Sequence, residues 1–308
     1  MLLRPLTVVT AIGSLTAVAL VGRLLIVLGS KTRQNTGEPV LAQEDTLNDH
    51  LAAFTANLHA GQPYRQPKAA EREAGEQAFS ALLDAGRDGP AELAGLGFSV
   101  QNGVDTATGR PYTLAMNAPD SERAWGLYLI DRSAPPSLVV EVPHPASDLR
   151  TELFGLAYFR KAPGAVMLMA GAHRRADGNR GDVAHEEDSL FHVIAASLAR
   201  RGLPQIQLHG FDDQSMPGKD FVLSAGATQA GAPARRAADG LSEAGFEVCR
   251  AWAEPCKELE GTTNVQGRTA AAEGTTFLHV EMSRTVREDA GRRAAVVGAL
   301  AEARLSEH

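Results

Sequence analysis

The chain has 308 residues, with 30 Lys or Arg against 37 Asp or Glu, and a formal net charge of −7. Its 44% apolar and 22% charged residues are typical of a globular protein, which excludes a disordered or collagen-like chain. The acidic balance argues against a general nucleic-acid-binding protein, which needs a dense cationic face. Two cysteines are too few for a disulfide-scaffold fold or a multi-cysteine zinc site.

The N-terminal residues 1–30 form a separate hydrophobic segment. Arg4 precedes an uncharged, largely apolar run from Leu6 to Val21, and a shorter apolar run follows Arg23. This pattern is typical of a secretory signal peptide. It also fits a membrane anchor that contacts the bilayer through residues 6–28. We therefore expect an exported protein, either periplasmic or extracellular, or one held at the membrane by this hydrophobic helix.

The rest of the chain divides by composition into a linker and a domain. Residues 31–69 are polar and predict a linker with one short helix over 49–59. Residues 70–308 predict a single α/β catalytic domain. Cys249 and Cys256 lie in its second half, and in an oxidising compartment they are candidates for a disulfide. Two unrelated free thiols are the alternative.

Residues 70–308 alternate between β-like and helical runs. Three short β-like runs separated by turns predict an antiparallel entry to a sheet. Continuous apolar runs then alternate with helices, which predicts a mixed, mostly parallel sheet with helices on both faces. The predicted strands are 97–101, 112–116, 125–130, 137–142, 165–170, 205–208, 221–224 and 276–281, and the predicted helices are 71–85, 147–161, 186–201, 234–244 and 288–305.

Polar residues fall where these predicted strands end. His144, His173 and His209 each come just after or at the end of a strand, and His279 and Glu281 lie near the end of another. Ligands of open α/β sheets bind outside the carboxyl ends of the strands. The sequence therefore predicts a site at this edge of the sheet.

The first of these segments carries a histidine followed by two carboxylates. His144 precedes Asp148 and Glu152, which share one face if the following helix begins at Ser147. Zinc takes His nitrogen and carboxylate oxygen as ligands and keeps one position open in catalytic sites. His144 and either acid are candidate ligands, with Asp148 favoured by its proximity. A structural hydrogen bond for His144 is the alternative.

Two later segments supply a second histidine and a carboxylate. His209 ends a buried strand and is followed by Gly210, which leaves space beside it. Glu281 lies in an otherwise apolar strand, where a carboxylate is costly to bury unless it is paired or functional. A general base for an attacking water is the functional interpretation, and an ion pair with Arg284 or Arg287 is the structural one.

Cationic and amide side chains in the connecting loops are candidates for binding a substrate carboxylate or an oxyanion. A polar loop follows the strand 165–170, and a second loop precedes the last strand. The candidate substrate-binding residues are His173, Arg174, Arg175, Arg180, Asn264, Arg268 and Arg284.

Three motifs together resemble the zinc carboxypeptidase-like superfamily. They are Pro143-His144, Leu208-His209-Gly210 and His279-Val280-Glu281, and the resemblance covers residues 125–305. The nearest branches are the N-formylglutamate amidohydrolase-like and poly-γ-glutamate hydrolase-like ones. One departure concerns the second metal ligand, because Ser147 stands where the family pattern His-x-x-Glu has its acid.

The resemblance implies a carboxypeptidase-like fold that binds one zinc ion. It places the ion on His144, on Asp148 or Glu152, and on His209, with Glu281 as the general base. It also implies hydrolysis of an amide bond in a small molecule or peptide that bears carboxylates, such as an acyl-amino acid, a γ-glutamyl polymer or a cell-wall peptide. The alternative is a non-catalytic, envelope-associated binding protein on a degenerate hydrolase fold.

Overall fold

The computed structural model describes residues 46–85 and 91–305. The predicted signal or anchor segment and the first part of the predicted linker lie outside these residues. None of the helices in the described ranges has the length and apolar character needed to span a bilayer.

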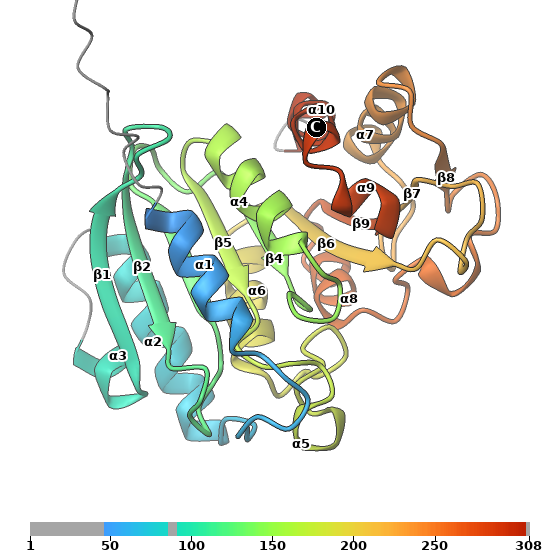
Figure 1. Cartoon of the computed structure of the whole chain (residues 1–308). Coiled ribbons are helices and arrows are strands. Elements are labelled where there is room, and N and C mark those ends of the chain that lie inside the picture. The colour runs from blue at the N-terminus through green and yellow to red at the C-terminus, as the bar shows by residue number, and fades with distance from the viewer. Residues whose placement is uncertain (1–45, 86–90, 306–308) are drawn as a thin grey trace, which may run out of the picture. The chain divides into compact units, whose positions relative to one another are not determined.

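A nine-stranded sheet runs through the described part of the chain, in the order β1-β2-β3-β5-β4-β6-β9-β7-β8 (Figure 1). The strands are β1 (Phe98–Val104), β2 (Pro111–Asn117), β3 (Leu127–Asp131), β4 (Leu138–Val142), β5 (Ala165–Met169), β6 (Gln205–Phe211), β7 (Phe221–Ser224), β8 (Val248–Arg250) and β9 (Phe277–Ser283).

The parallel strands occupy the centre of this sheet. Strands β5, β4, β6 and β9 are joined by parallel pairs. Strands β1, β2 and β3 enter as an antiparallel meander, as the sequence predicts, and β3 pairs antiparallel with β5. On the other side β7 runs antiparallel to β9 and parallel to β8. The predicted mixed α/β sheet is confirmed, and the carboxyl ends of β4, β6 and β9 come together at one edge.

Helices cover both faces of the sheet (Figure 1). One apolar core includes side chains of four helices, which are α1 (Thr46–Ala56), α4 (Thr151–Lys161), α7 (Ala232–Glu243) and α10 (Ala290–Glu302). The second apolar core includes side chains of α2 (Ala69–Ala85), α3 (Ala91–Gly95) and α6 (Leu190–Arg200). Helix α8 (Val265–Ala272) packs against α6 and β9. The short helices α5 (Ala176–Asn179), η1 (Lys257–Leu259) and α9 (Arg284–Glu288) lie in connecting segments.

Residues 46–69, which composition assigns to a linker, pack into the domain instead. Leu47, Leu51, Phe54 and Leu58 are buried in the same apolar core as α4 and α10. Burying four large apolar side chains stabilises the fold by about 1.5–3 kcal/mol each before the entropy of ordering the segment is counted. The α/β domain therefore begins before residue 70.

Two helices, α4 and α6, begin about one turn later than their sequences predict. Residue Arg150 has a left-handed backbone (φ 73°), so α4 starts at Thr151 and the segment from Ser147 to Arg150 is a turn. In α6 the hydroxyl of Ser189 accepts a hydrogen bond from the amide of His192 and caps the helix, which therefore excludes Glu186. Strand β8 and helix α8 are not among the predicted elements.

Candidate metal centre

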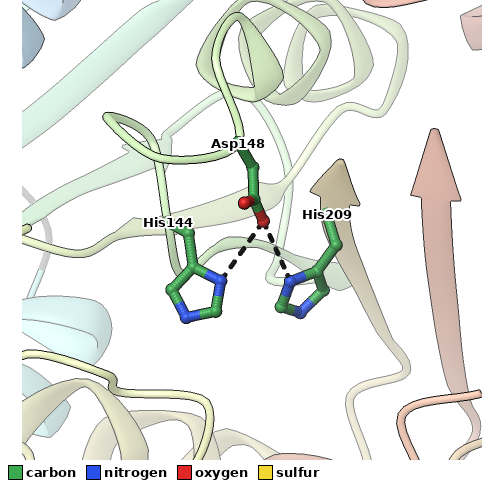
Figure 2. A group of neighbouring side chains, drawn as sticks. All are labelled: His144, Asp148 and His209. Carbon is green, nitrogen blue, oxygen red and sulfur yellow. Dashed lines mark hydrogen bonds and ion pairs between the residues drawn. The ribbon is translucent and has the colours of Figure 1, made fainter. Parts of the chain in front are cut away.

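Two histidines and one aspartate converge at the carboxyl ends of β4 and β6 (Figure 2). His144 follows β4, His209 lies in β6, and Asp148 lies on the turn before α4. Figure 2 shows the Asp148 carboxylate between the two imidazole rings. Its Oδ2 is 3.2 Å from Nδ1 of His144 and 3.2 Å from Nδ1 of His209.

The two 3.2 Å separations fit a zinc ion, and all three ligand atoms lie within 4.8 Å of one another. Tetrahedral ligands at about 2.0–2.1 Å from zinc lie about 3.3 Å from one another. All three side chains are buried, with exposed fractions of 1% for His144, 6% for Asp148 and 5% for His209. Nitrogen and carboxylate donors are also the ligand types that zinc accepts. These residues therefore form a candidate metal centre.

Glu281 lies next to this group on the neighbouring strand. The parallel register pairs His209 directly with Glu281, and Gln207 with His279. Ligand atoms of His209, His279 and Glu281 form a second set within 4.8 Å of one another. Oε2 of Glu281 and Nδ1 of His279 are buried without a hydrogen-bond partner. Unpartnered buried polar atoms beside the candidate ligands indicate a place for a bound water or substrate atom.

Burial and the neighbouring charges set the ionisation of these groups. Burial opposes a charge on His144, but the carboxylates of Asp148 and Asp182 outweigh it and raise the pKa of His144. Burial also opposes ionisation of Asp148, yet the neighbouring imidazoles of His144 and His209 lower its pKa. Burial lowers the pKa of His209, so that its imidazole is neutral at pH 7, the form that binds metal.

The carboxyl group of Glu281 shows the opposite shift. Burial, reinforced by the negative charge of Asp148, raises the pKa of Glu281 well above its usual value. Carboxyl groups with raised pKa values are suited to accepting and returning a proton near neutral pH.

A loop between β5 and α6 supports His144 from the other side. Oδ1 of Asp182 lies 2.8 Å from Nε2 of His144 and 3.1 Å from Nδ1 of His185, and Oδ2 accepts a 2.6 Å hydrogen bond from Arg174. A carboxylate on the outer nitrogen of a ligating histidine fixes the ring and raises its basicity. Asp182 is not predicted for this role from the sequence, because 38 residues separate it from His144.

One buried arginine links the three segments that carry the site. The Arg287 guanidinium donates to the carbonyls of Met282, Leu149 and Phe211. These residues adjoin Glu281, Asp148 and the His209-Gly210 pair in the sequence. Arg287 therefore fixes the backbone beside Asp148, His209 and Glu281. It does not form the ion pair with Glu281 that is the structural alternative in the sequence.

The candidate ligands line a polar cavity of about 710 Å³. Arg174 and Lys257 place two cationic side chains in its wall, and Asn264 adds an amide. The cavity is lined by His144, Asp148, Arg174, His185, His209, Gly210, Phe211, Ser215, the segment 257–264, His279 and Glu281.

Several predicted site residues lie outside this cavity. Glu152 is buried on α4 and belongs to neither group of candidate ligands, which leaves Asp148 as the acid that the structure places beside His144. The His173 ring lies 3.3 Å from the hydroxyl of Ser147. The remaining arginines are exposed or pair with nearby acids; they are Arg175, Arg180 with Asp177, Arg268 with Glu187, and Arg284 with Glu288.

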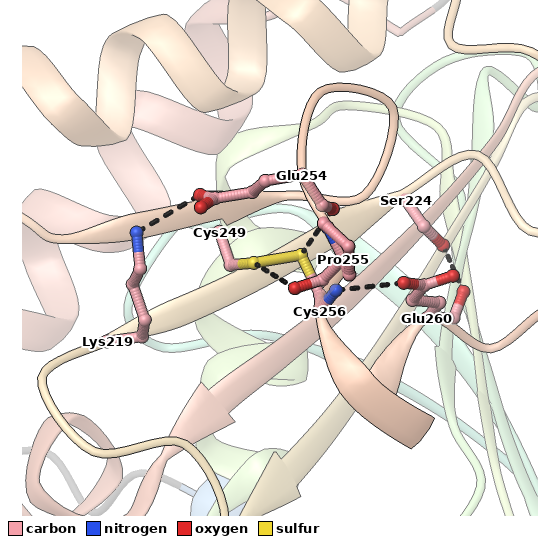
Figure 3. Close-up of a disulfide and its surroundings, with 7 residues drawn as sticks. All are labelled: Lys219, Ser224, Cys249, Glu254, Pro255, Cys256 and Glu260. Carbon is pink, nitrogen blue, oxygen red and sulfur yellow. Dashed lines mark hydrogen bonds and ion pairs between the residues drawn. A yellow bond between two sulfur atoms is a disulfide. The ribbon is translucent and has the colours of Figure 1, made fainter.

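A disulfide joins Cys249 to Cys256 at the start of the segment that lines the cavity (Figure 3). The Cys256 amide donates a hydrogen bond to Glu260, and the Glu260 carbonyl accepts one from Ser224 of β7. Figure 3 shows both contacts beside the sulfur atoms. The disulfide therefore ties one wall of the cavity to the edge of the sheet, and the alternative of free thiols is not what the structure shows.

Comparisons with known proteins give distant structural similarities. No protein-family model matches the sequence, and no curated protein matches it. The chain is similar to a bacteriophage poly-γ-glutamate hydrolase, with 14% identity, a TM-score of 0.41, and coverage of 57% of this chain and 86% of that chain.

Two further solved structures are similar at the same level. An aspartoacylase family protein from Mesorhizobium loti has 14% identity and a TM-score of 0.36 over 66% of this chain and 71% of that chain. A metallo-carboxypeptidase from Burkholderia cenocepacia has 15% identity and a TM-score of 0.36 over 78% of this chain and 69% of that chain. Because the likeness is distant, we infer the function from the side chains themselves.

Proposed function

We propose that this protein is a zinc-dependent hydrolase that cleaves an amide bond in a carboxylate-bearing substrate. The observation that carries the proposal is the convergence of His144 Nδ1, Asp148 Oδ2 and His209 Nδ1, with Glu281 on the adjacent strand. These three residues would hold the ion, with the acid at position 148, one residue later than in the His-x-x-Glu pattern of the zinc carboxypeptidase-like superfamily. Zinc, when bound there, would supply Lewis-acid polarisation of the scissile carbonyl and an acidified water.

The protein side chains supply the remaining chemistry. Glu281 would accept a proton from the attacking water and return it to the leaving amine, a role for which its raised pKa is suited. Arg174 and Lys257 lie in the cavity wall, and their positive charges favour an anionic substrate. Acyl-amino acids, γ-glutamyl peptides and cell-wall peptides all combine an amide bond with free carboxylates.

Export of the protein is part of this proposal. The disulfide between Cys249 and Cys256 supports an oxidising compartment, and the apolar sequence from Leu6 to Val21 supports a signal or membrane anchor. A periplasmic, extracellular or membrane-anchored enzyme would meet cell-wall peptides and scavenged acyl-amino acids.

Metal content tests the binding half of the proposal. Wild-type protein purified without chelator and offered zinc should carry about one zinc per chain. The His209→Ala variant should lose it, because only two of the three donors remain. His173→Ala is the matched control and should keep the metal, since His173 lies outside the candidate groups. A metal-free wild type would refute the proposal and favour the binding-protein alternative.

Turnover of carboxylate-bearing amides tests the catalytic half. Glu281→Gln should keep zinc and lose about 10²- to 10⁴-fold in kcat, because a glutamine cannot accept the proton. Glu152→Gln is a matched control, since Glu152 is another buried glutamate with a pKa raised by burial but lies outside the candidate groups. Equal activity in wild type and Glu281→Gln would contradict the assigned role.

A further inference from the structure

A chain of amide hydrogen bonds leads from the N-terminus of helix α8 to the imidazole of His209. Oδ1 of Asn264 caps this helix by accepting hydrogen bonds from the backbone amides of Gln266 and Gly267. Backbone amides only donate, so the cap fixes which atom of the Asn264 side chain is oxygen. The nitrogen, Nδ2, therefore faces the other way and donates to Oε1 of Gln207.

The orientation of Gln207 follows from Asn264 and is fixed a second time by Gln266. Nε2 of Gln266 donates to the carbonyl of Val183 at 2.8 Å, which leaves its Oε1 to accept from Nε2 of Gln207 at 3.3 Å. The same Gln207 nitrogen donates to Oε2 of Glu141 at 2.7 Å. With all four side chains buried, reversing the Gln207 amide would break several hydrogen bonds at once.

The fixed amide of Gln207 in turn dictates where His209 carries its proton. Nε2 of His209 lies 2.7 Å from Oε1 of Gln207, an oxygen that can only accept. Nε2 must therefore hold hydrogen, and the neutral ring keeps its lone pair on Nδ1. Nδ1 faces Oδ2 of Asp148 at the longer distance of 3.2 Å, within the candidate metal centre.

We propose that Asn264 and Gln207 are positioning residues that hold His209 in the tautomer whose Nδ1 is free to bind a metal ion. The inference rests on the proposed function for its metal. Asn264 and Gln207 belong to neither group of candidate ligands, and the inference gives these buried amides a role in metal binding. It also explains why Asn264, a predicted substrate-binding residue that lines the cavity, has its amide turned toward Gln207.

Two substitutions of Asn264 separate this role from simple packing. Asn264→Asp keeps the cap oxygen and the size of the side chain but replaces the donor with an acceptor. Gln207 must then turn its nitrogen toward the new carboxylate, and His209 must move its proton to Nδ1. Asn264→Ser also keeps a cap oxygen, but it removes the amide and leaves Gln266 to orient Gln207. A packing role predicts more damage from the smaller serine, and the positioning role predicts more from aspartate.

The tautomer of His209 is measured first, by ¹⁵N NMR on histidine-labelled, metal-free protein above the pH range of imidazole titration. A His209→Asn variant assigns the signal. Wild type and Asn264→Ser should show hydrogen on Nε2, and Asn264→Asp should show it on Nδ1. Zinc affinity, measured by competition with a chelator, should fall about 10- to 100-fold in Asn264→Asp and less in Asn264→Ser.

Hydrogen on Nδ1 of His209 in the wild type would overturn the inference. So would a loss of zinc affinity in Asn264→Ser equal to that in Asn264→Asp. A wild type that shows hydrogen on Nε2 but binds no zinc would refute the proposed function while supporting the orientation of His209. Failure of the inference and failure of the proposed function are therefore distinguishable. Thermal unfolding of each variant confirms that it is folded before either readout is taken.

Discussion

Arg287 donates a 2.6 Å hydrogen bond to the carbonyl of Leu149, the residue that follows Asp148. The same guanidinium reaches the carbonyls of Phe211 and Met282, so one side chain holds together the ends of β6 and β9 and the turn before α4. A single planar group with several donors can satisfy three carbonyls at once, which an ammonium group cannot match in this geometry.

Replacing Arg287 by lysine should therefore destabilise the fold while keeping the charge. At least one buried carbonyl loses its donor, and an unsatisfied buried group costs about 1–3 kcal/mol. We expect the free energy of unfolding, measured in urea, to fall by about that amount. Arg284→Lys is the control, because Arg284 is exposed and pairs with Glu288. If the two variants are equally stable, the three hydrogen bonds of Arg287 do not stabilise the fold.

The buried carboxyl of Glu141 predicts a dependence of stability on pH. Burial raises the pKa of Glu141 from 4.5 to about 8 in the folded chain. Between those values the folded chain holds a proton that the unfolded chain releases, so the free energy of unfolding falls as the pH rises. The total is several kcal/mol, because each pKa unit corresponds to about 1.4 kcal/mol.

Glu141→Gln should remove this component of the pH dependence. The amide oxygen can still accept the hydrogen bond from Gln207, and it needs no proton to stay neutral. Urea unfolding at pH 5 and pH 8 should show a smaller decrease for the variant than for the wild type. Parallel decreases in the two proteins would mean that Glu141 titrates normally.

Asp182 should affect metal binding without being a ligand. Asp182→Asn removes the charge that faces Nε2 of His144, and loss of such a partner typically costs 10- to 100-fold in metal affinity. Competition with a chelator measures the change. Asp177→Asn in the same loop is the control, because Asp177 is exposed and pairs with Arg180. An unchanged affinity in Asp182→Asn would remove Asp182 from the site.

The disulfide should stabilise the fold and the cavity wall together. Its seven-residue separation predicts a contribution of about 2–3 kcal/mol from the restricted unfolded chain. The double variant Cys249→Ser, Cys256→Ser should lose about this much in urea unfolding. It should also raise KM for a cleaved substrate more than it lowers kcat, because segment 257–264 lines the cavity but holds none of the candidate ligands. An unchanged KM would separate the disulfide from substrate binding.

The sequence predicts the sheet and the residues at its edge because both depend on local patterns. Apolar runs mark the buried strands, and the ends of parallel strands meet, so His144, His209 and Glu281 fall together without knowledge of any contact. The choice between Asp148 and Glu152 depends on where α4 begins. That point is set by the left-handed Arg150, which no periodicity reveals.

The supporting residues are missed for a different reason. Asp182 meets His144 only through the path of a long loop, and Arg287 reaches Leu149 across 138 residues. Gln207 does carry a local signal, since it lies two residues before His209 on the same strand face. Two of the predicted substrate-binding arginines, Arg268 and Arg284, form ion pairs with Glu187 and Glu288 instead. These pairs depend on the geometry of the surface, which the sequence does not reveal.

Gly210 gives the Arg287 contact a consequence for related sequences. A Cβ at position 210 would lie 2.3 Å from Nε and 2.4 Å from Cζ of Arg287. The guanidinium cannot yield, because its three carbonyl partners hold it in place. A side chain at position 210 is therefore tolerated only when position 287 is smaller. Among homologues the two positions should vary as a pair, with arginine at 287 accompanied by glycine after the second histidine.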